Sequence, residues 1–155
     1  MTPKFTEEMA WIFNVKNDNN IKGEDIYDHR MQDGFWGLHK LTGSGKRTAN
    51  VASLREGDKV LFYWVGKDGQ RFLGTCVLAS IWRELKPDET DKRHDDWGDW
   101  PEGVDLKKES IENWKRAHST LSIERLPFIT IKQGSVIKIT PEEYDRVIRE
   151  HNNQR

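Results

Sequence analysis

Two apolar runs joined by a short, glycine-containing turn constrain the fold of this sequence most. Residues 59–65 read KVLFYWV and residues 71–81 read RFLGTCVLASI, and both are rich in the β-branched and aromatic residues that favour strands. Between them, the Asp68-Gly69 pair favours the positive φ angles of a hairpin turn. Strands joined by so short a turn run antiparallel, so the chain is predicted to contain an antiparallel hairpin.

The rest of the chain alternates short strands with short helices. The patterns predict strands over 10–16, 128–131 and 135–139 and short helices over 48–55 and 110–117. The last element is a helix that begins at Thr140-Pro141-Glu142-Glu143, which supplies an N-cap, a proline in the first turn and a capping-box glutamate. Residues 86–103 have the composition of a long binding loop. This order predicts an α+β fold, a small mixed β-barrel with flanking short helices.

Length and composition limit the class of protein. A chain of 155 residues fits one domain, so we expect a single domain over 1–155. No apolar run has the length of a membrane span or of a signal sequence, which predicts a cytoplasmic protein without membrane contact; we also expect a monomer. The lone Cys76 excludes an internal disulfide and is interpreted as core packing.

Tryptophan is unusually frequent, with seven in the chain, and it supplies large flat surfaces for packing or stacking. Trp11, Trp64 and Trp114 fall in regular elements, so we assign them to the core. The sequence shows no spacing that is diagnostic of a catalytic triad. One histidine beside two carboxylates, His94-Asp95-Asp96, is a poor set of metal ligands, so neither a metal nor another cofactor is expected.

The glycine-containing segment 41–48, LTGSGKRT, is superficially similar to a phosphate-binding loop of nucleotide enzymes. Such a loop requires a glycine at the position of Lys40 and a serine or threonine at the position of Arg47. The nucleotide interpretation is therefore rejected. Between residues 36 and 60, however, five basic residues oppose two acidic ones, a local charge of +3. A basic segment in a nearly neutral chain suits a local contact with phosphates, although an ordinary solvated loop explains the charge equally well.

An ordered set of short motifs carries a resemblance to a known family. The set consists of Trp11-Ile12, Gly34-Phe35-Trp36-Gly37, Asn50, Leu54-Arg55-Glu56-Gly57-Asp58, Gly74-Thr75-Cys76-Val77, Arg125-Leu126-Pro127-Phe128 and Thr140-Pro141-Glu142-Glu143-Tyr144. In this order and spacing the chain resembles the EVE domain of the PUA-like superfamily, over about 10–148. EVE domains are related to YTH domains, which read methylated adenine in RNA. The resemblance implies a PUA-like barrel that binds nucleic acid.

The resemblance also implies roles for individual residues. It places Trp36 as one wall of an aromatic cage, Trp97 and Trp100 jointly as the second wall, and Trp82 as a third candidate for that wall. Base-edge contacts fall to Asn14, Lys16, Asn17 and Asn50, and phosphate contacts to Lys40, Lys46 and Arg47. One departure from the family is Ala49, since several EVE domains carry an arginine before the asparagine.

These roles lead to a functional hypothesis. The chain is expected to be a non-catalytic reader that flips a methylated or hydroxymethylated base of DNA or RNA into an aromatic cage. Stacking a base on an aromatic side chain recovers about 1–3 kcal/mol of the free energy lost on leaving the base stack. The alternatives are a small hydrolase or nucleotide-processing enzyme on a PUA-like barrel, as the related ASCH group suggests, and a module that binds a peptide. The base, its modification and the choice between DNA and RNA stay open.

Overall fold

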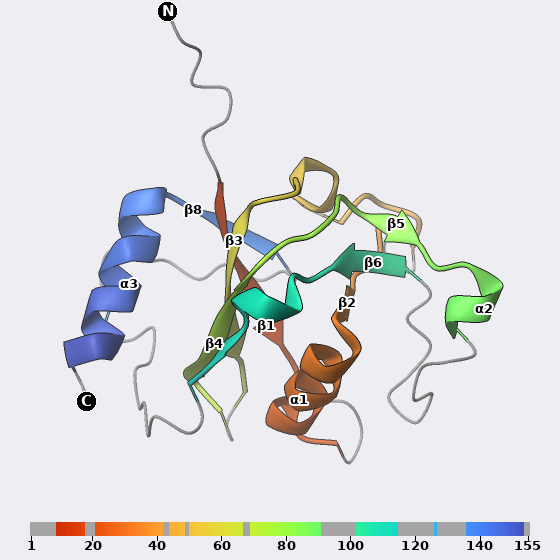
Figure 1. The fold of residues 1–155 in the computed structure, drawn as a ribbon. Coiled ribbons are helices and arrows are strands. Elements are labelled where there is room, and N and C mark those ends of the chain that lie inside the picture. Colours follow the sequence, from red (N-terminus) through yellow and green to blue (C-terminus); the bar gives the residue numbers. More distant parts are fainter. Residues whose placement is uncertain are drawn as a thin grey trace, which may run out of the picture.

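The computed structural model describes residues 9–17, 21–41, 44–48, 50–66, 69–90, 102–114, 126 and 136–153. The described strands form two sheets, with helices around them (Figure 1). The main sheet has the order β7-β4-β3-β1-β8, with β1 at Ala10–Val15, β3 at Lys59–Trp64, β4 at Arg71–Val77, β7 at Glu112–Asn113 and β8 at Val136–Ile139. The first strand runs parallel to β3 and antiparallel to β8. The main sheet is therefore mixed.

The hairpin predicted from residues 59–81 is confirmed. Strands β3 and β4 pair antiparallel, from Lys59 opposite Val77 to Trp64 opposite Arg71. The register shifts between Phe62 and Tyr63, opposite the segment that contains Gly74. Residues 67–68 of the turn lie outside the described residues. The predicted strands at 10–16 and 135–139 are confirmed as β1 and β8, and the predicted strand at 128–131 falls outside the described part.

A smaller sheet lies beside the main one and has the order β2-β6-β5. These strands are β2 at Phe35–Gly37, β6 at Glu102–Asp105 and β5 at Arg83–Glu84, and both pairings are antiparallel. A single bridge between Leu78 and Leu106 links the chain after β4 to the chain after β6. The predicted α+β class is confirmed. Among the described strands the hydrogen bonds leave the barrel open, because they form two sheets instead of one closed cylinder.

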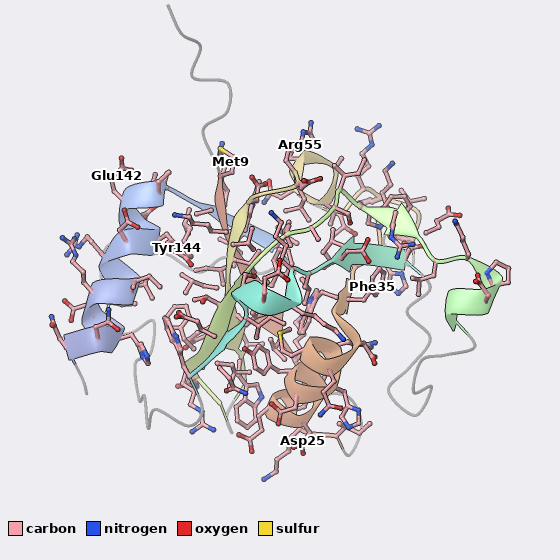
Figure 2. The ribbon with its side chains drawn as sticks, viewed as in Figure 1. Met9, Asp25, Phe35, Arg55, Glu142 and Tyr144 are labelled. Carbon is pink, nitrogen blue, oxygen red and sulfur yellow. The ribbon has the colours of Figure 1, made fainter. Side chains whose placement is uncertain are left out.

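The closing helix α3, Pro141–Asn153, begins where its capping signals predict. The Thr140 hydroxyl accepts the Glu143 N–H at 3.0 Å, and the Glu143 carboxylate accepts the Thr140 N–H at 2.8 Å. This reciprocal pair is a capping box. The predicted apolar face is confirmed too, since Val147 is fully buried, with Tyr144 and Ile148 packed around it. Figure 2 shows Tyr144 on the side of α3 that faces the main sheet.

Two helix predictions were wrong, the first in its extent and the second in the type of structure that its described residues 110–114 form. Over 48–55 the structure has only the 3₁₀ turn Val51–Ser53 among its described residues, because Asn50 before it adopts a left-handed conformation with φ of 69°. Over 110–117 the described residues form the end of the 3₁₀ turn Lys108–Ser110 and then β7. The Ser110 hydroxyl does not cap a helix; it accepts the N–H of Val77 at 2.8 Å and so fixes this turn to β4.

Two helices were not predicted from the sequence. The first is α1 at Gly23–Asp33, and the second is the short α2 at Pro87–Thr90 inside the expected loop. Helix α1 buries Tyr27 and Met31, which are four residues apart and so lie on one face. The helix ends at Gly34, whose φ of 71° is favourable for glycine, and the chain then turns into β2. No described helix has the length and hydropathy that a membrane span requires.

The core has two parts, one on each face of the main sheet. In β1, the side chains of Trp11, Phe13 and Val15 belong to the first core, and those of Ala10 and Ile12 belong to the second. Helix α1 and β2 cover the first core, whereas α3 covers the second (Figure 1). The core assignments of Trp11, Trp64 and Trp114 are confirmed, because each is at most 4% exposed. Cys76 is also buried, and burial raises the pKa of its thiol, which keeps it protonated and unreactive.

Candidate nucleic-acid interface

Trp36, the predicted cage wall, lies in the short strand β2, opposite Val104 of β6. Its ring centre is 4.8 Å from that of Phe62 and 6.5 Å from that of Phe13, so the indole packs on β3 and β1. Only 6% of the residue is exposed. The expected open wall is not seen in this conformation, because the indole is part of the first core. A role for Trp36 in base binding stays a prediction and requires an opening beside the ring.

The two strands that carry Trp36 and Val104 approach each other closely through glycine. Gly37 pairs with Gly103, and a β-carbon on Gly103 would collide with the backbone of Trp36. On the neighbouring strand β5, Arg83 is the partner of Gly103 and makes two hydrogen bonds to Asp105, at 2.7 and 3.0 Å. Its guanidinium group also lies 5.5 Å from the ring centre of Phe35. The glycine pair lets β2 and β6 approach closely, and the contacts of Arg83 with Asp105 and Phe35 link β5 to both strands.

The chain after β2 runs directly along Trp82. The indole N–H of Trp82 donates to the carbonyl of Leu38 at 2.9 Å. The Lys40 ammonium lies 4.8 Å from the centre of the same indole, a cation–π contact. Trp82 is half-buried against the first core. Of the three candidates for the second cage wall, Trp82 is the one that the structure describes, since Trp97 and Trp100 lie outside the described residues.

Glu102, at the start of β6, was not predicted to take part in this region. Its carboxylate accepts the backbone N–H of Lys40 at 2.9 Å and lies 3.4 Å from Nδ1 of His39. Its backbone carbonyl accepts the N–H of Leu38 at 2.9 Å. Glu102 therefore fixes the path of the chain between Trp36 and the basic residues. No local pattern in the sequence indicates this role, because the interaction joins residues 62 apart in the chain.

The predicted phosphate-binding residues lie together on one small hairpin. The Thr48 N–H donates to the Lys40 carbonyl at 2.9 Å, and Leu41 forms an antiparallel bridge with Arg47. We call the described residues 40–41 and 44–48 the basic hairpin. The side chains of Lys40, Lys46 and Arg47 are exposed on it. The hairpin follows β2 after two residues, so the structure brings these cations to the end of the strand that carries Trp36.

The polar residues predicted to read the base edge have separate positions. Side chains alternate along β1, so Asn14 lies on the face of Ala10 and Ile12, whereas Trp36 contacts Phe13 on the other face. The structure therefore does not bring Asn14 together with Trp36, and a role for Asn14 in base recognition stays a prediction. Lys16 is exposed just after the end of β1.

Asn17 and Asn50 both use a side-chain atom to hold the fold. The Asn17 carboxamide oxygen accepts the N–H of Gly23 at 2.7 Å and the indole N–H of Trp64 at 2.9 Å. The Asn50 Nδ2 donates to the carbonyl of Val136 at 2.9 Å and so joins its turn to β8. Asparagine also tolerates the left-handed backbone at residue 50 better than most residues. Their roles in base recognition stay predictions.

The described residues offer no metal-binding group. Among them, no cluster of three or more His, Cys, Asp or Glu side chains is arranged to hold a metal ion. The set that the sequence suggested only weakly, His94-Asp95-Asp96, falls in the part of the chain that the structure does not describe.

Comparisons with known proteins bear on the fold. No protein-family model and no curated protein matches the sequence. Among solved structures, a hypothetical protein from Leishmania major superposes with a TM-score of 0.64 and 15% identity, covering 96% of this chain and 97% of that one. The N-terminal domain of Thermococcus gammatolerans McrB, bound to m5C DNA, gives a TM-score of 0.53 and 13% identity, covering 94% and 98%.

The YTH domain of Zygosaccharomyces rouxii MRB1, in complex with N6-methyladenosine RNA, gives a TM-score of 0.51 and 15% identity, covering 97% of this chain and 94% of that one. The chain shares the fold of these domains, an α+β fold of the PUA-like type. At these identities the likeness shows the fold alone. A PUA-like domain of this type is a scaffold whose function depends on the residues of its own site.

Proposed function

We propose that this PUA-like domain is a non-catalytic reader of a modified base in nucleic acid. The base, flipped out of its stack, would be held between Trp36 and a second aromatic wall, while the basic hairpin holds the neighbouring phosphates. The observation that carries the proposal is the direct passage of β2 into the basic hairpin, with Trp82 against the connection. Trp82 and three cations then lie along the chain segment that leaves the strand of Trp36.

The burial of Trp36 adds a requirement to this mechanism. With 6% of the residue exposed, a base can stack on the indole only after the covering groups move. The inner side of the ring is fixed by Phe13 and Phe62, so the opening would occur on the side away from β1 and β3. Part of the stacking free energy would be used for this displacement. The observed affinity would equal the affinity of the open state multiplied by the fraction of molecules in that state.

The remaining groups suit recognition of a base edge. Asn50 has its Nδ2 engaged with Val136, so its side-chain oxygen would act as the acceptor for an exocyclic amine. Asn17 has its oxygen engaged with Trp64 and Gly23, so it would contribute its amide N–H as a donor. Lys16 is exposed nearby in sequence and would add a second donor. A methyl group on the base would add apolar contact with the aromatic walls.

A binding screen tests the proposal. Single-stranded and duplex DNA and RNA would carry 5-methylcytosine, 5-hydroxymethylcytosine or N6-methyladenine, with unmodified strands as the reference. Fluorescence anisotropy should show tighter binding to one modified probe than to its unmodified partner. Equal affinity for every modified and unmodified probe would exclude a reader function.

Trp36→Leu then identifies the wall, because leucine keeps an apolar group in the core and removes the stacking surface. The expected loss is about 1–3 kcal/mol, or about 5- to 150-fold in affinity. Trp114→Leu is the matched control, since Trp114 is equally buried, at 4%, but lies in the second core. The control should keep the affinity of the original chain. An unchanged affinity for Trp36→Leu, with the fold retained, would remove Trp36 from the site.

The role of the basic hairpin is tested by salt dependence. Replacing Lys46 and Arg47 with glutamine should weaken binding to modified and unmodified strands by similar factors. The slope of log affinity against log salt should fall by about one for each phosphate that the protein no longer neutralises. A change that affects only the modified strand would place these side chains against the base instead.

A further inference from the structure

Two large hydrophobic residues are exposed on the described surface. They are Leu41, which is 53% exposed, and Ile81, which is 56% exposed. Single exposed apolar residues are common and need no explanation. These two, however, are the chain neighbours of Lys40 and Trp82, the partners of the cation–π contact. Both residues therefore neighbour, along the chain, members of the region proposed for nucleic-acid binding.

Leu41 differs from Ile81 in its surroundings. It is the bridge partner of Arg47 in the basic hairpin, so the two side chains project from the same side of the hairpin. Both residues are exposed. The hairpin is closed below them by the hydrogen bond from Thr48 to Lys40. The result is an exposed apolar side chain with a guanidinium group directly beside it and two lysines on the same hairpin.

This arrangement suits the groove of a duplex. Cations on a hairpin can hold the phosphates of the two strands, and an exposed apolar side chain beside them can enter between base steps that have been partly unstacked. A base that leaves a duplex leaves a gap in the stack, and an apolar side chain that fills the gap restores part of the stacking free energy. A single strand has no such gap to keep open.

We propose that Leu41 is a wedge that enters the base stack next to the flipped base, and that the substrate of this domain is therefore a duplex. This inference rests on the proposed reader function and adds to it the substrate class and the residue that separates the bases. Arg47 holds the flanking phosphate on the same side as the wedge.

The test compares Leu41→Ser with Ile81→Ser, two changes that remove similar exposed apolar groups. The probes are a DNA duplex with one 5-methylcytosine, an RNA duplex with one N6-methyladenosine, and the modified single strand of each. On the duplex that the unaltered chain prefers, Leu41→Ser should lower the affinity by about tenfold, which is the scale of removing one half-buried leucine side chain. On the single strand it should change the affinity by less than about twofold. Ile81→Ser should have little effect on either probe.

Several outcomes would overturn the wedge. An unchanged duplex affinity for Leu41→Ser, or an equal loss on duplex and single strand, shows that Leu41 does not separate bases. An equal loss for Ile81→Ser and Leu41→Ser indicates a general apolar surface. These results would leave the reader function standing, provided that the unaltered chain still prefers a modified strand. If it prefers none of the modified probes, both proposals fail together.

Discussion

Asp58 should be the most sensitive polar position in the described structure. It is 2% exposed, and its carboxylate accepts three hydrogen bonds, from the Met9 N–H at 3.1 Å, the Trp11 indole N–H at 2.8 Å and the Arg55 N–H at 2.9 Å. Figure 2 shows Met9 and Arg55 at the same end of the molecule. Asp58 thus joins the start of β1 to the turn before β3.

The expected cost of removing Asp58 follows from these three hydrogen bonds. In Asp58→Ala, the Met9 and Arg55 amides lie near the surface and can bind water, whereas the indole N–H of the fully buried Trp11 cannot. A hydrogen bond to a charged group contributes about 1.5–3 kcal/mol, and an unsatisfied buried donor costs about 1–3 kcal/mol. We therefore expect the free energy of unfolding to fall by about 3–5 kcal/mol, a large part of the about 5–15 kcal/mol typical of a domain.

Urea unfolding followed by circular dichroism measures this change. With an m-value of about 2 kcal/mol per molar urea, the midpoint should fall by about 2 M. Glu56→Ala is the matched control, because Glu56 is an exposed carboxylate in the same turn, and its removal should change stability by less than about 0.5 kcal/mol. A decrease below about 1 kcal/mol for Asp58→Ala would refute the reasoning, since it would mean that the buried indole finds another partner.

Three further predictions concern other positions. Burial raises the pKa of Tyr144 from its ordinary value of 10.0 to about 12. As the pH rises, the unfolded chain therefore loses the Tyr144 proton before the folded chain does. The stabilising contribution of Tyr144 is complete below pH 10 and should be lost as the pH rises towards 12. In urea unfolding, the free energy of unfolding of Tyr144→Phe should therefore decline less steeply over this pH range than that of the unaltered chain. Gly103→Ala should cost about 1–3 kcal/mol in the same assay, because the new methyl group meets the backbone of Trp36; no decrease would mean that β2 moves freely. Asn50→Ala should lower the free energy of unfolding by about 1 kcal/mol more than Asn50→Gly, because glycine adopts the left-handed backbone without strain and alanine does not. Equal decreases for the two variants would mean that Asn50 contributes only its hydrogen bond to Val136.

Interactions between near neighbours in sequence were predicted best. The hairpin of β3 and β4 and the start of α3 depend on turn and cap residues within a few positions of the elements they join. Helix α1 was missed because its buried apolar residues are few and spaced within a polar segment. The 110–117 segment was assigned wrongly because the hydroxyl of Ser110 can cap a helix or bind a strand, and Val77, which decides between them, is 33 residues away.

The sequence by itself determined the α+β class, the core positions of Trp11, Trp64 and Trp114, and the basic character of the segment after Trp36. These properties depend on composition and on local periodicity, which are independent of how the sheets pack. Only the tertiary structure decided that the Trp36 indole is buried on Phe62, that Trp82 lies along the chain leaving β2, and that Asn14 faces the other core. Each of these depends on contacts between residues far apart in the chain, and on which side of a strand packs inward, and neither is encoded in a short stretch of sequence.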